Sequence, residues 1–200
     1  KNYGNKKKLL LLGESHFCPK ETDKNIIGNW YNINNSVLNK DVIEWTSTSK
    51  IIDYNITNNR FTGSHTIYRN IFYAINETGF TLEENKNVLT YIAYMNFFQK
   101  PAQETGESVQ VNSDDKNVAN IVLKNVIDII KPDYLFFLSS ISWDFFDKNI
   151  FAINKMGHSS HPTSIWWNRA TAKYTKPLEE KIITGKESFK YFIRINKIFE

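Results

Sequence analysis

Two short polar motifs near opposite ends of the chain contain the residues best suited to catalysis. The first is Gly-Glu-Ser-His-Phe at residues 13–17, which follows an apolar run, and the second is Gly-His-Ser-Ser-His-Pro-Thr-Ser at residues 157–164. Carboxylate, hydroxyl and imidazole groups transfer protons and stabilise charge in active sites. If one sheet brings the motifs together, a single pocket would hold four candidate residues: Glu14, Ser15, His16 and His161.

Strand-like segments alternate with helical ones along the chain. Leu9–Leu12 is a continuous apolar run that ends at Gly13, which is typical of a strand buried on both faces. Three further strands are expected at Val88–Phe98, at Tyr134–Leu138 and from about Phe151–Ile153. Helices are expected around Ile67–Ile75, around Val118–Ile130 opened by Ser113 or Asp114, at Ser142–Asn149 and at Glu187–Phe199.

This alternation predicts an α/β fold, with three α/β/α layers around a central, mostly parallel four-stranded sheet. No linker or repeat divides the sequence, so we expect one domain over residues 1–200. Residues 18–60 are Asn-rich and weakly periodic, which indicates an insertion or irregular region, with Val42–Trp45 as an edge strand. Ligands bind at the carboxyl ends of parallel strands. Polar residues that follow the apolar runs should therefore point at one rim: Glu14, Asn96, the Ser139–Ser140 pair and His161.

Composition limits the classes of protein that fit. The net charge of +4 and pI of about 9.0 permit an anionic partner such as nucleic acid without establishing one. Cys18 is the single cysteine, which excludes a disulfide framework and a cysteine-ligated cluster built from one chain. No apolar run reaches about 18 residues, so we expect no membrane span and a cytoplasmic protein. A metal site made by the histidines alone is disfavoured because metal sites usually include a carboxylate or thiolate.

In order along the chain, the motifs resemble those of the uracil-DNA glycosylase superfamily. Gly13-Glu14-Ser15-His16-Phe17 is similar to its first motif, Asn96 to the asparagine that ends a central strand, and His161-Pro162-Thr163-Ser164 to its last motif. The resemblance covers about residues 8–170 and excludes the iron–sulfur branches, which need four cysteines. It implies the superfamily fold, a role in DNA repair, no cofactor or metal, and a monomer that binds single- or double-stranded DNA.

The resemblance also implies roles for individual residues. A glycosylase extrudes its base into a narrow pocket and stabilises the negative charge that develops on the departing base. His161 matches the donor to the base oxygen, and Asn96 matches the group that reads the base edge. Glu14 is the candidate for positioning or activating water. The remaining candidates for contact with the base are Gly13, His16, Phe17 and Ser164.

Several positions depart from the superfamily pattern. Ser15 stands where some families have a water-handling aspartate, and His16 stands where they have proline. Phe17 replaces a tyrosine that narrows the pocket against the thymine methyl group. Phe61, in Phe-Thr-Gly-Ser, resembles the phenylalanine that stacks on the base, although it lies further from the first motif than usual.

Residues that follow the last motif are candidates for contact with DNA. Bulky apolar side chains fill the gap left by a flipped base, and basic side chains bind phosphates. Trp166 is the candidate wedge and Arg169 the candidate phosphate contact, although Trp166 or Trp167 could instead belong to the core.

Two other readings remain open. Gly-Glu-Ser also resembles the Gly-Asp-Ser start of small esterases, in which Ser15 would be the nucleophile, His161 the base and Asn96 an oxyanion donor. Those enzymes place an aspartate three residues before the histidine, where this chain has His158. The third reading is a glycosylase-like protein that binds a nucleotide or DNA without cleaving it.

Overall fold

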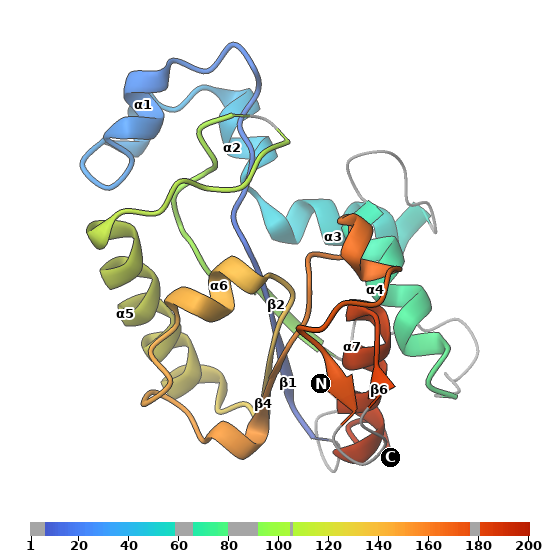
Figure 1. Cartoon of the computed structure of the whole chain (residues 1–200). Helices are drawn as coiled ribbons and strands as arrows, with labels where there is room; N and C mark the ends of the chain where they lie inside the picture. The colour runs from blue at the N-terminus through green and yellow to red at the C-terminus, as the bar shows by residue number, and fades with distance from the viewer. Residues whose placement is uncertain (1–6, 59–65, 80–91, 105, 177–180) are drawn as a thin grey trace.

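A four-stranded, entirely parallel sheet forms the centre of the protein (Figure 1). The computed structural model describes residues 7–58, 66–79, 92–104, 106–176 and 181–200. The strands are β1 (Leu9–Gly13), β2 (Ile92–Asn96), β3 (Tyr134–Phe137) and β4 (Met156–His158), and their order in the sheet is β2-β1-β3-β4. The predicted α/β class with a four-stranded sheet is therefore confirmed.

Helices cover both faces of this sheet, and they bury β1 on both sides. Leu9 and Leu11 point to one face and pack with α4 (Thr66–Asn76) and α7 (Gly185–Ile195). Leu10 and Leu12 point to the other face, which is covered by α5 (Ser113–Ile130) and α6 (Ser140–Phe145). Figure 1 shows α5 and α6 on one side of the sheet and α4 and α7 on the other. The predicted three layers follow from this alternation.

Short helices make up much of the described part of the segment between β1 and α4. The segment contains α1 (Lys24–Gly28), the 3₁₀ helix η1 (Asn35–Val37), α2 (Lys40–Trp45) and α3 (Thr48–Asn58). The predicted edge strand at Val42–Trp45 is therefore wrong. Asn39 begins α2 by accepting a hydrogen bond from the Val42 amide at 2.9 Å, and this cap outweighs the strand propensity of the β-branched residues. In Figure 1, α1 and α2 lie above the carboxyl ends of the strands.

Two strand boundaries differ from the sequence-based expectation. Residues 153–155 form the 3₁₀ helix η4, and β4 begins only at Met156, which pairs with Leu135. Ile153 is 64% exposed, so its apolar character does not reflect a place in the sheet. Strand β2 begins at Ile92, and the earlier part of Val88–Phe98 lies outside the described residues.

The helices occur close to their expected positions. Helix α5 begins at Ser113 with Asn112 as its cap, and α6 and α7 begin two residues before the expected starts. The 3₁₀ helix η5 (Ile165–Trp167) and the two-stranded sheet of β5 (Thr175–Lys176) and β6 (Lys181–Ile182) complete the described chain.

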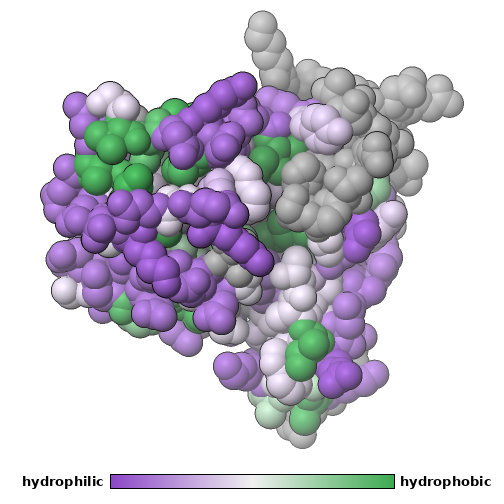
Figure 2. Space-filling model, turned by 90° about the horizontal axis from the view of Figure 1, so that it is seen from above, coloured by the Kyte–Doolittle hydropathy of each residue, from purple (hydrophilic) through white to green (hydrophobic). Residues whose placement is uncertain are grey.

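The surface beyond the carboxyl ends of the strands is mainly hydrophilic, with small hydrophobic patches among the described residues (Figure 2). None of the helices in the described part of the chain has the length and apolar character needed to cross a bilayer.

Candidate functional site

A pocket of about 320 Å³ lies at the carboxyl ends of β1 and β2. The parallel register sets Gly13 opposite Asn96. The two segments stay paired beyond the strands, because the amides of Phe97 and Phe98 donate to the carbonyls of Gly13 and Glu14. Both motifs meet here. The residues that line the pocket are Ser15, His16, Phe17, Glu44, Trp45, Ile51, Ile67, Tyr68, Tyr94, Asn96, His161 and Thr163.

The pocket has one polar wall and one apolar wall. Strand ends and the loop after β4 supply polar groups, among them Asn96 and His161. The apolar wall comes from the helical segment and α4, through Trp45, Ile51 and Ile67. Trp45 is 46% exposed, so part of its ring is available to a ligand. This combination of a few polar groups with apolar walls is typical of small-molecule sites.

Gly13 is required by the close packing of the polar wall. A Cβ atom at this position would overlap the Tyr94 hydroxyl and Asn96 Oδ1. Tyr94 and Asn96 are two residues apart on β2 and therefore share one face of the sheet. Because glycine leaves this space open, both side chains can lie across the end of β1.

A chain of hydroxyl groups crosses this wall between His16 and Asn96. His16 Nε2 lies 3.1 Å from Thr48 Oγ1, and Thr48 in turn interacts with Tyr68. The Tyr68 ring meets the Tyr94 ring edge to face with centroids 5.3 Å apart, and the Tyr94 hydroxyl donates to Asn96 Oδ1 at 3.1 Å. We call Thr48, Tyr68 and Tyr94 the hydroxyl chain. Burial raises the pKa of both tyrosines, so they stay protonated.

The hydrogen bonds around His161 define its tautomer. The backbone amide of Thr163 donates to His161 Nδ1 at 3.3 Å, and Thr163 Oγ1 lies 2.7 Å from the same nitrogen. A backbone amide can only donate, so Nδ1 is the acceptor and the neutral ring carries its proton on Nε2. Burial lowers the pKa of His161, and the nearby Glu14 carboxylate offsets part of this shift. The ring nitrogen left for a ligand in the pocket is therefore an N–H donor.

Glu14 is anchored behind the pocket and is not among the residues that line it. Its Oε1 accepts from the Val109 amide at 3.1 Å, and its Oε2 accepts from Ser139 Oγ at 2.8 Å. Ser139 is also the N-cap of α6. The carboxylate thus joins three segments, and its negative charge acts on His161 through space.

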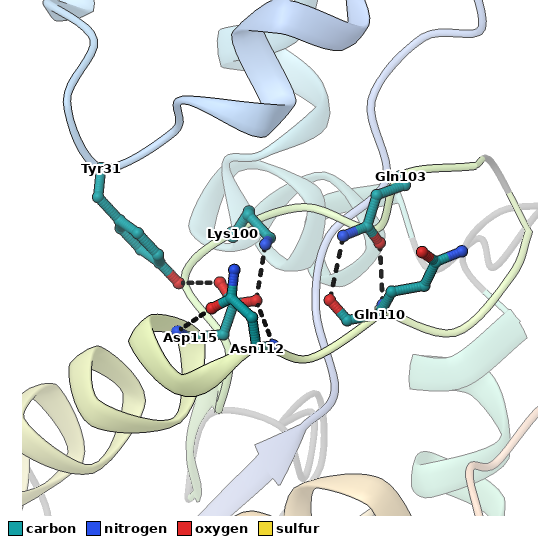
Figure 3. A network of polar contacts seen from close by, with 6 residues as sticks. All are labelled: Tyr31, Lys100, Gln103, Gln110, Asn112 and Asp115. Atoms are coloured by element: carbon teal, nitrogen blue, oxygen red, sulfur yellow. Dashed lines mark hydrogen bonds and ion pairs between the residues drawn. The ribbon is translucent and has the colours of Figure 1, made fainter.

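A buried ion pair holds the loop that contacts Glu14. Lys100 Nζ lies 2.6 Å from Asp115 Oδ2, and these residues are only 5% and 0% exposed. Tyr31 donates to Asp115 Oδ1 at 3.0 Å, and the Asn112 amide donates to Oδ2 at 3.0 Å (Figure 3). We call these four residues the closed network.

The rest of the loop is held by amide and backbone contacts. Gln103 and Gln110 exchange two hydrogen bonds across the loop, as Figure 3 shows. The Ala102 amide donates to the His16 carbonyl at 2.8 Å. The loop is therefore fixed against the first motif, and its Val109 amide is in place to bind Glu14.

His158, the first histidine of the 157–164 motif, serves packing. The ring of His158 stacks on Trp143 with centroids 4.5 Å apart and an interplanar angle of 2°, and Tyr174 meets its edge. Lys148 Nζ lies 3.9 Å from the centroid of the Trp143 ring. Burial lowers the pKa of His158 to about 4, and does the same for His16. Both rings are neutral at pH 7.

The residues proposed to contact DNA separate into buried and exposed ones. Trp167 is 1% exposed and packs near Phe189, whereas Trp166 is 49% exposed. Arg169 is exposed, and Ser164 Oγ is buried without a hydrogen-bond partner among the described residues. Phe61 lies outside the described residues.

Sequence reasoning missed much of the pocket. Trp45 and Glu44 come from the segment regarded as an irregular insertion, and no local signal joins them to the strand ends. Tyr94 could have been found, because a strand places residue i−2 on the same face as Asn96. Tyr68 lies on the expected helix around Ile67–Ile75, whose spacing gives no sign that this residue packs in the core and also lines the pocket.

Comparison with protein-family models, with curated proteins and with solved structures gives no significant match for this chain. Within the described ranges, no cluster of three or more His, Cys, Asp or Glu side chains is arranged to hold a metal ion.

Proposed function

We propose that the protein hydrolyses the N-glycosidic bond of a base flipped out of DNA. The observation that carries this proposal is the neutral His161, whose Nδ1 accepts from Thr163 and whose Nε2–H is left for a ligand beside Asn96. Cleavage of the bond leaves negative charge on a base oxygen, and a donor preorganised at that oxygen lowers the barrier. A pocket of about 320 Å³ is at the small end of the range for ligand sites, as a single heterocycle requires.

The other pocket residues fit the same reaction. Phe17 and Trp45 present aromatic rings that could contact the faces of a heterocycle. Asn96 offers a polar edge to the base. Glu14 does not line the pocket, so its negative charge would act through space, as it does on His161, to stabilise the developing positive charge on the sugar.

The exposed residues after His161 support an approach by DNA. Ile165 and Trp166 are 58% and 49% exposed in η5, four and five residues after the histidine. Arg169 follows and is also exposed. An apolar pair followed by a cation is suited to filling an unstacked gap while binding a phosphate.

The geometry disfavours the esterase reading. A serine nucleophile needs a histidine nitrogen that can accept its proton, with the other nitrogen donating to a carboxylate. In this site Nδ1 accepts from a backbone amide, so Nε2 already carries a proton and cannot act as the base for Ser15.

The test is direct. Purified protein is incubated with oligonucleotides that contain one uracil, hypoxanthine or oxidised pyrimidine, in single and double strands, and abasic sites are detected by alkaline cleavage. We expect abasic product from at least one substrate and its loss in His161→Ala. Absence of product from every substrate, at protein concentrations that saturate binding, would reject glycosylase activity.

A second candidate function is binding of a flipped base without cleavage. It is favoured by the position of Glu14, which is tied to Val109 and Ser139 and does not line the pocket. This candidate predicts DNA affinity that falls as salt rises, because phosphate contacts release counterions, without any abasic product.

A further inference from the structure

We propose that Tyr94 and Tyr68 are positioning residues that hold the amide of Asn96 in one orientation, so that the pocket offers a ligand the amide nitrogen and not the oxygen. This inference rests on the proposed function, in which Asn96 reads the edge of a base. It assigns a specificity-determining role to two tyrosines that no sequence motif singled out.

The first observation is the direction of the hydrogen bond. The two ends of an asparagine amide have nearly the same shape but opposite hydrogen-bonding character. The Tyr94 hydroxyl donates to Asn96 Oδ1 at 3.1 Å, which engages the acceptor end of the amide. No group in the described part of the chain accepts from Asn96 Nδ2. The donor end is therefore the one available to a ligand.

The second observation is that Tyr94 itself is held from behind. Tyr68 interacts with both Tyr94 and Thr48, and Thr48 Oγ1 lies 3.1 Å from His16 Nε2. These neighbours restrict the position of Tyr94, whose hydroxyl proton goes to Asn96 Oδ1. The edge-to-face contact of the two rings, with centroids 5.3 Å apart, restricts their rotation.

The third observation is the space that admits this arrangement. Asn96 Oδ1 and the Tyr94 hydroxyl occupy the volume above Gly13 that a Cβ atom would need. The oxygen end of the amide is therefore packed against β1 as well as hydrogen-bonded. Turning the amide over would place an N–H group against the Tyr94 hydroxyl, which would then have to accept where it now donates.

The result is a polar wall with two donors, Asn96 Nδ2–H and His161 Nε2–H. A base that presents an amino group to Asn96 would set donor against donor. Buried polar groups left unpaired make such sites discriminate strongly. The tyrosines thus control discrimination at one edge of the base without touching the bond that breaks.

The first experiment needs no substrate. The side-chain amide of Asn96 is observed by ¹H–¹⁵N NMR in the free wild-type protein and in Tyr94→Phe, Tyr68→Phe and Tyr174→Phe. Tyr174 is the matched control because its hydroxyl lies 3.2 Å from Ser140 Oγ, away from the hydroxyl chain. We expect the Asn96 amide signals to move in Tyr94→Phe, to move less in Tyr68→Phe and to stay in place in the control. Unchanged signals in Tyr94→Phe, with wild-type backbone signals elsewhere, would overturn the inference whether or not the protein binds DNA.

The second experiment measures discrimination. Single-stranded oligonucleotides containing one 2′-fluorinated deoxyuridine or deoxycytidine resist cleavage and are compared by fluorescence anisotropy. We expect wild-type protein to prefer the uridine probe and Tyr94→Phe to reduce the affinity ratio by about tenfold, with Tyr174→Phe unchanged. A wild-type ratio that survives in Tyr94→Phe contradicts the positioning role. Binding of neither probe by wild-type protein contradicts the proposed function instead, and the NMR result then decides on the tyrosines.

Discussion

Two polar networks of the described chain differ in charge and in how they end. The closed network of Tyr31, Lys100, Asn112 and Asp115 contains a full ion pair that is almost completely buried. Both carboxylate oxygens of Asp115 are hydrogen-bonded. Removing one partner of such a pair leaves a buried charge without compensation. This network therefore fixes a loop and offers nothing to a ligand.

The hydroxyl chain is neutral and opens into the pocket. It runs from His16 to Asn96, both of which line the pocket, through three hydroxyl groups. Neutral groups cost less to bury than ions, so one end can remain unpaired until a ligand arrives. The difference teaches that burial and hydrogen bonding alone do not identify a site, whereas an unpaired donor at a pocket wall does.

The largest effect is expected from breaking the closed network. Asp115→Ala leaves the Lys100 ammonium buried and unpaired, and we expect the free energy of unfolding to fall by about 3–5 kcal/mol. Urea denaturation measures the loss. The control is Asp128→Ala, which removes an exposed i,i+4 pair with Lys124 and should change stability by no more than about 0.5 kcal/mol. Equal effects of the two substitutions would show that the closed network is not a stabilising scaffold.

The next largest effect is expected from removing the donor that His161 offers to a ligand. His161→Ala removes the proposed donor to the base oxygen, and we expect the rate of abasic-site formation to fall by about 10²- to 10³-fold with little change in stability. His158→Phe is the matched control, because that ring is packed between Trp143 and Tyr174 and should leave the rate nearly unchanged. Single-turnover assays on the best substrate distinguish the two. A larger loss in the control would remove His161 from its proposed role.

Acid should lower the free energy of unfolding, because the folded protein buries two neutral histidine rings. Burial lowers the pKa of His16 and of His158 from 6.5 to about 4, so the unfolded chain takes up these protons first as the pH falls. Stability is therefore complete above pH 6.5 and is lost between pH 6.5 and about 4. The slope is up to about 1.4 kcal/mol per pH unit for each histidine. Urea denaturation between pH 7.5 and 4.5 checks it, and a slope in His16→Gln as steep as in wild type would contradict this account.

The smallest effect concerns the apolar wall. Trp45 is 46% exposed at the pocket, and a ring that stacks on a base contributes about 1–3 kcal/mol to binding. We expect Trp45→Ala to weaken binding of the preferred oligonucleotide by about tenfold or more and Trp45→Phe to retain most of the affinity. Tyr73→Ala is the control, because Tyr73 is 53% exposed on α4 and does not line the pocket. Fluorescence anisotropy measures all three, and equal losses in Trp45→Ala and Tyr73→Ala would exclude stacking on Trp45.

Local pattern was sufficient to predict three strands of the sheet. The four leucines of β1 indicate a strand buried on both faces, the runs at β2 and β3 are strand-like, and helical periodicity located α4, α5 and α7. Weak patterns led to errors. Val42–Trp45 has β-branched residues, but the Asn39 cap makes it a helix, and the exposed Ile153 suggested a strand where η4 lies. A short apolar segment is ambiguous until its burial is known.

Part of the pocket could be predicted because the ends of parallel strands meet at one rim. This rule placed Asn96 and His161 there, the meeting of the two motifs added Ser15 and His16, and the family resemblance added Phe17; all five line the pocket. Glu14 was placed there too, but the Val109 amide and Ser139 hold its carboxylate behind the wall. The direction of a side chain depends on its hydrogen-bond partners, and these come from distant segments that spacing does not reveal.

The sequence by itself determined the strands, their alternation with helices and the polar residues at the strand ends, because these depend on periodicities of two and 3.6 residues within short windows. The tertiary structure alone decided that Trp45 and Asn96 would line one pocket, that the Tyr68 ring would pack against Tyr94 and that Thr163 would leave the proton of His161 on Nε2. Apart from the turn around His161, these contacts join residues far apart in the chain. They form only when the burial of two apolar sheet faces brings those segments to a common rim.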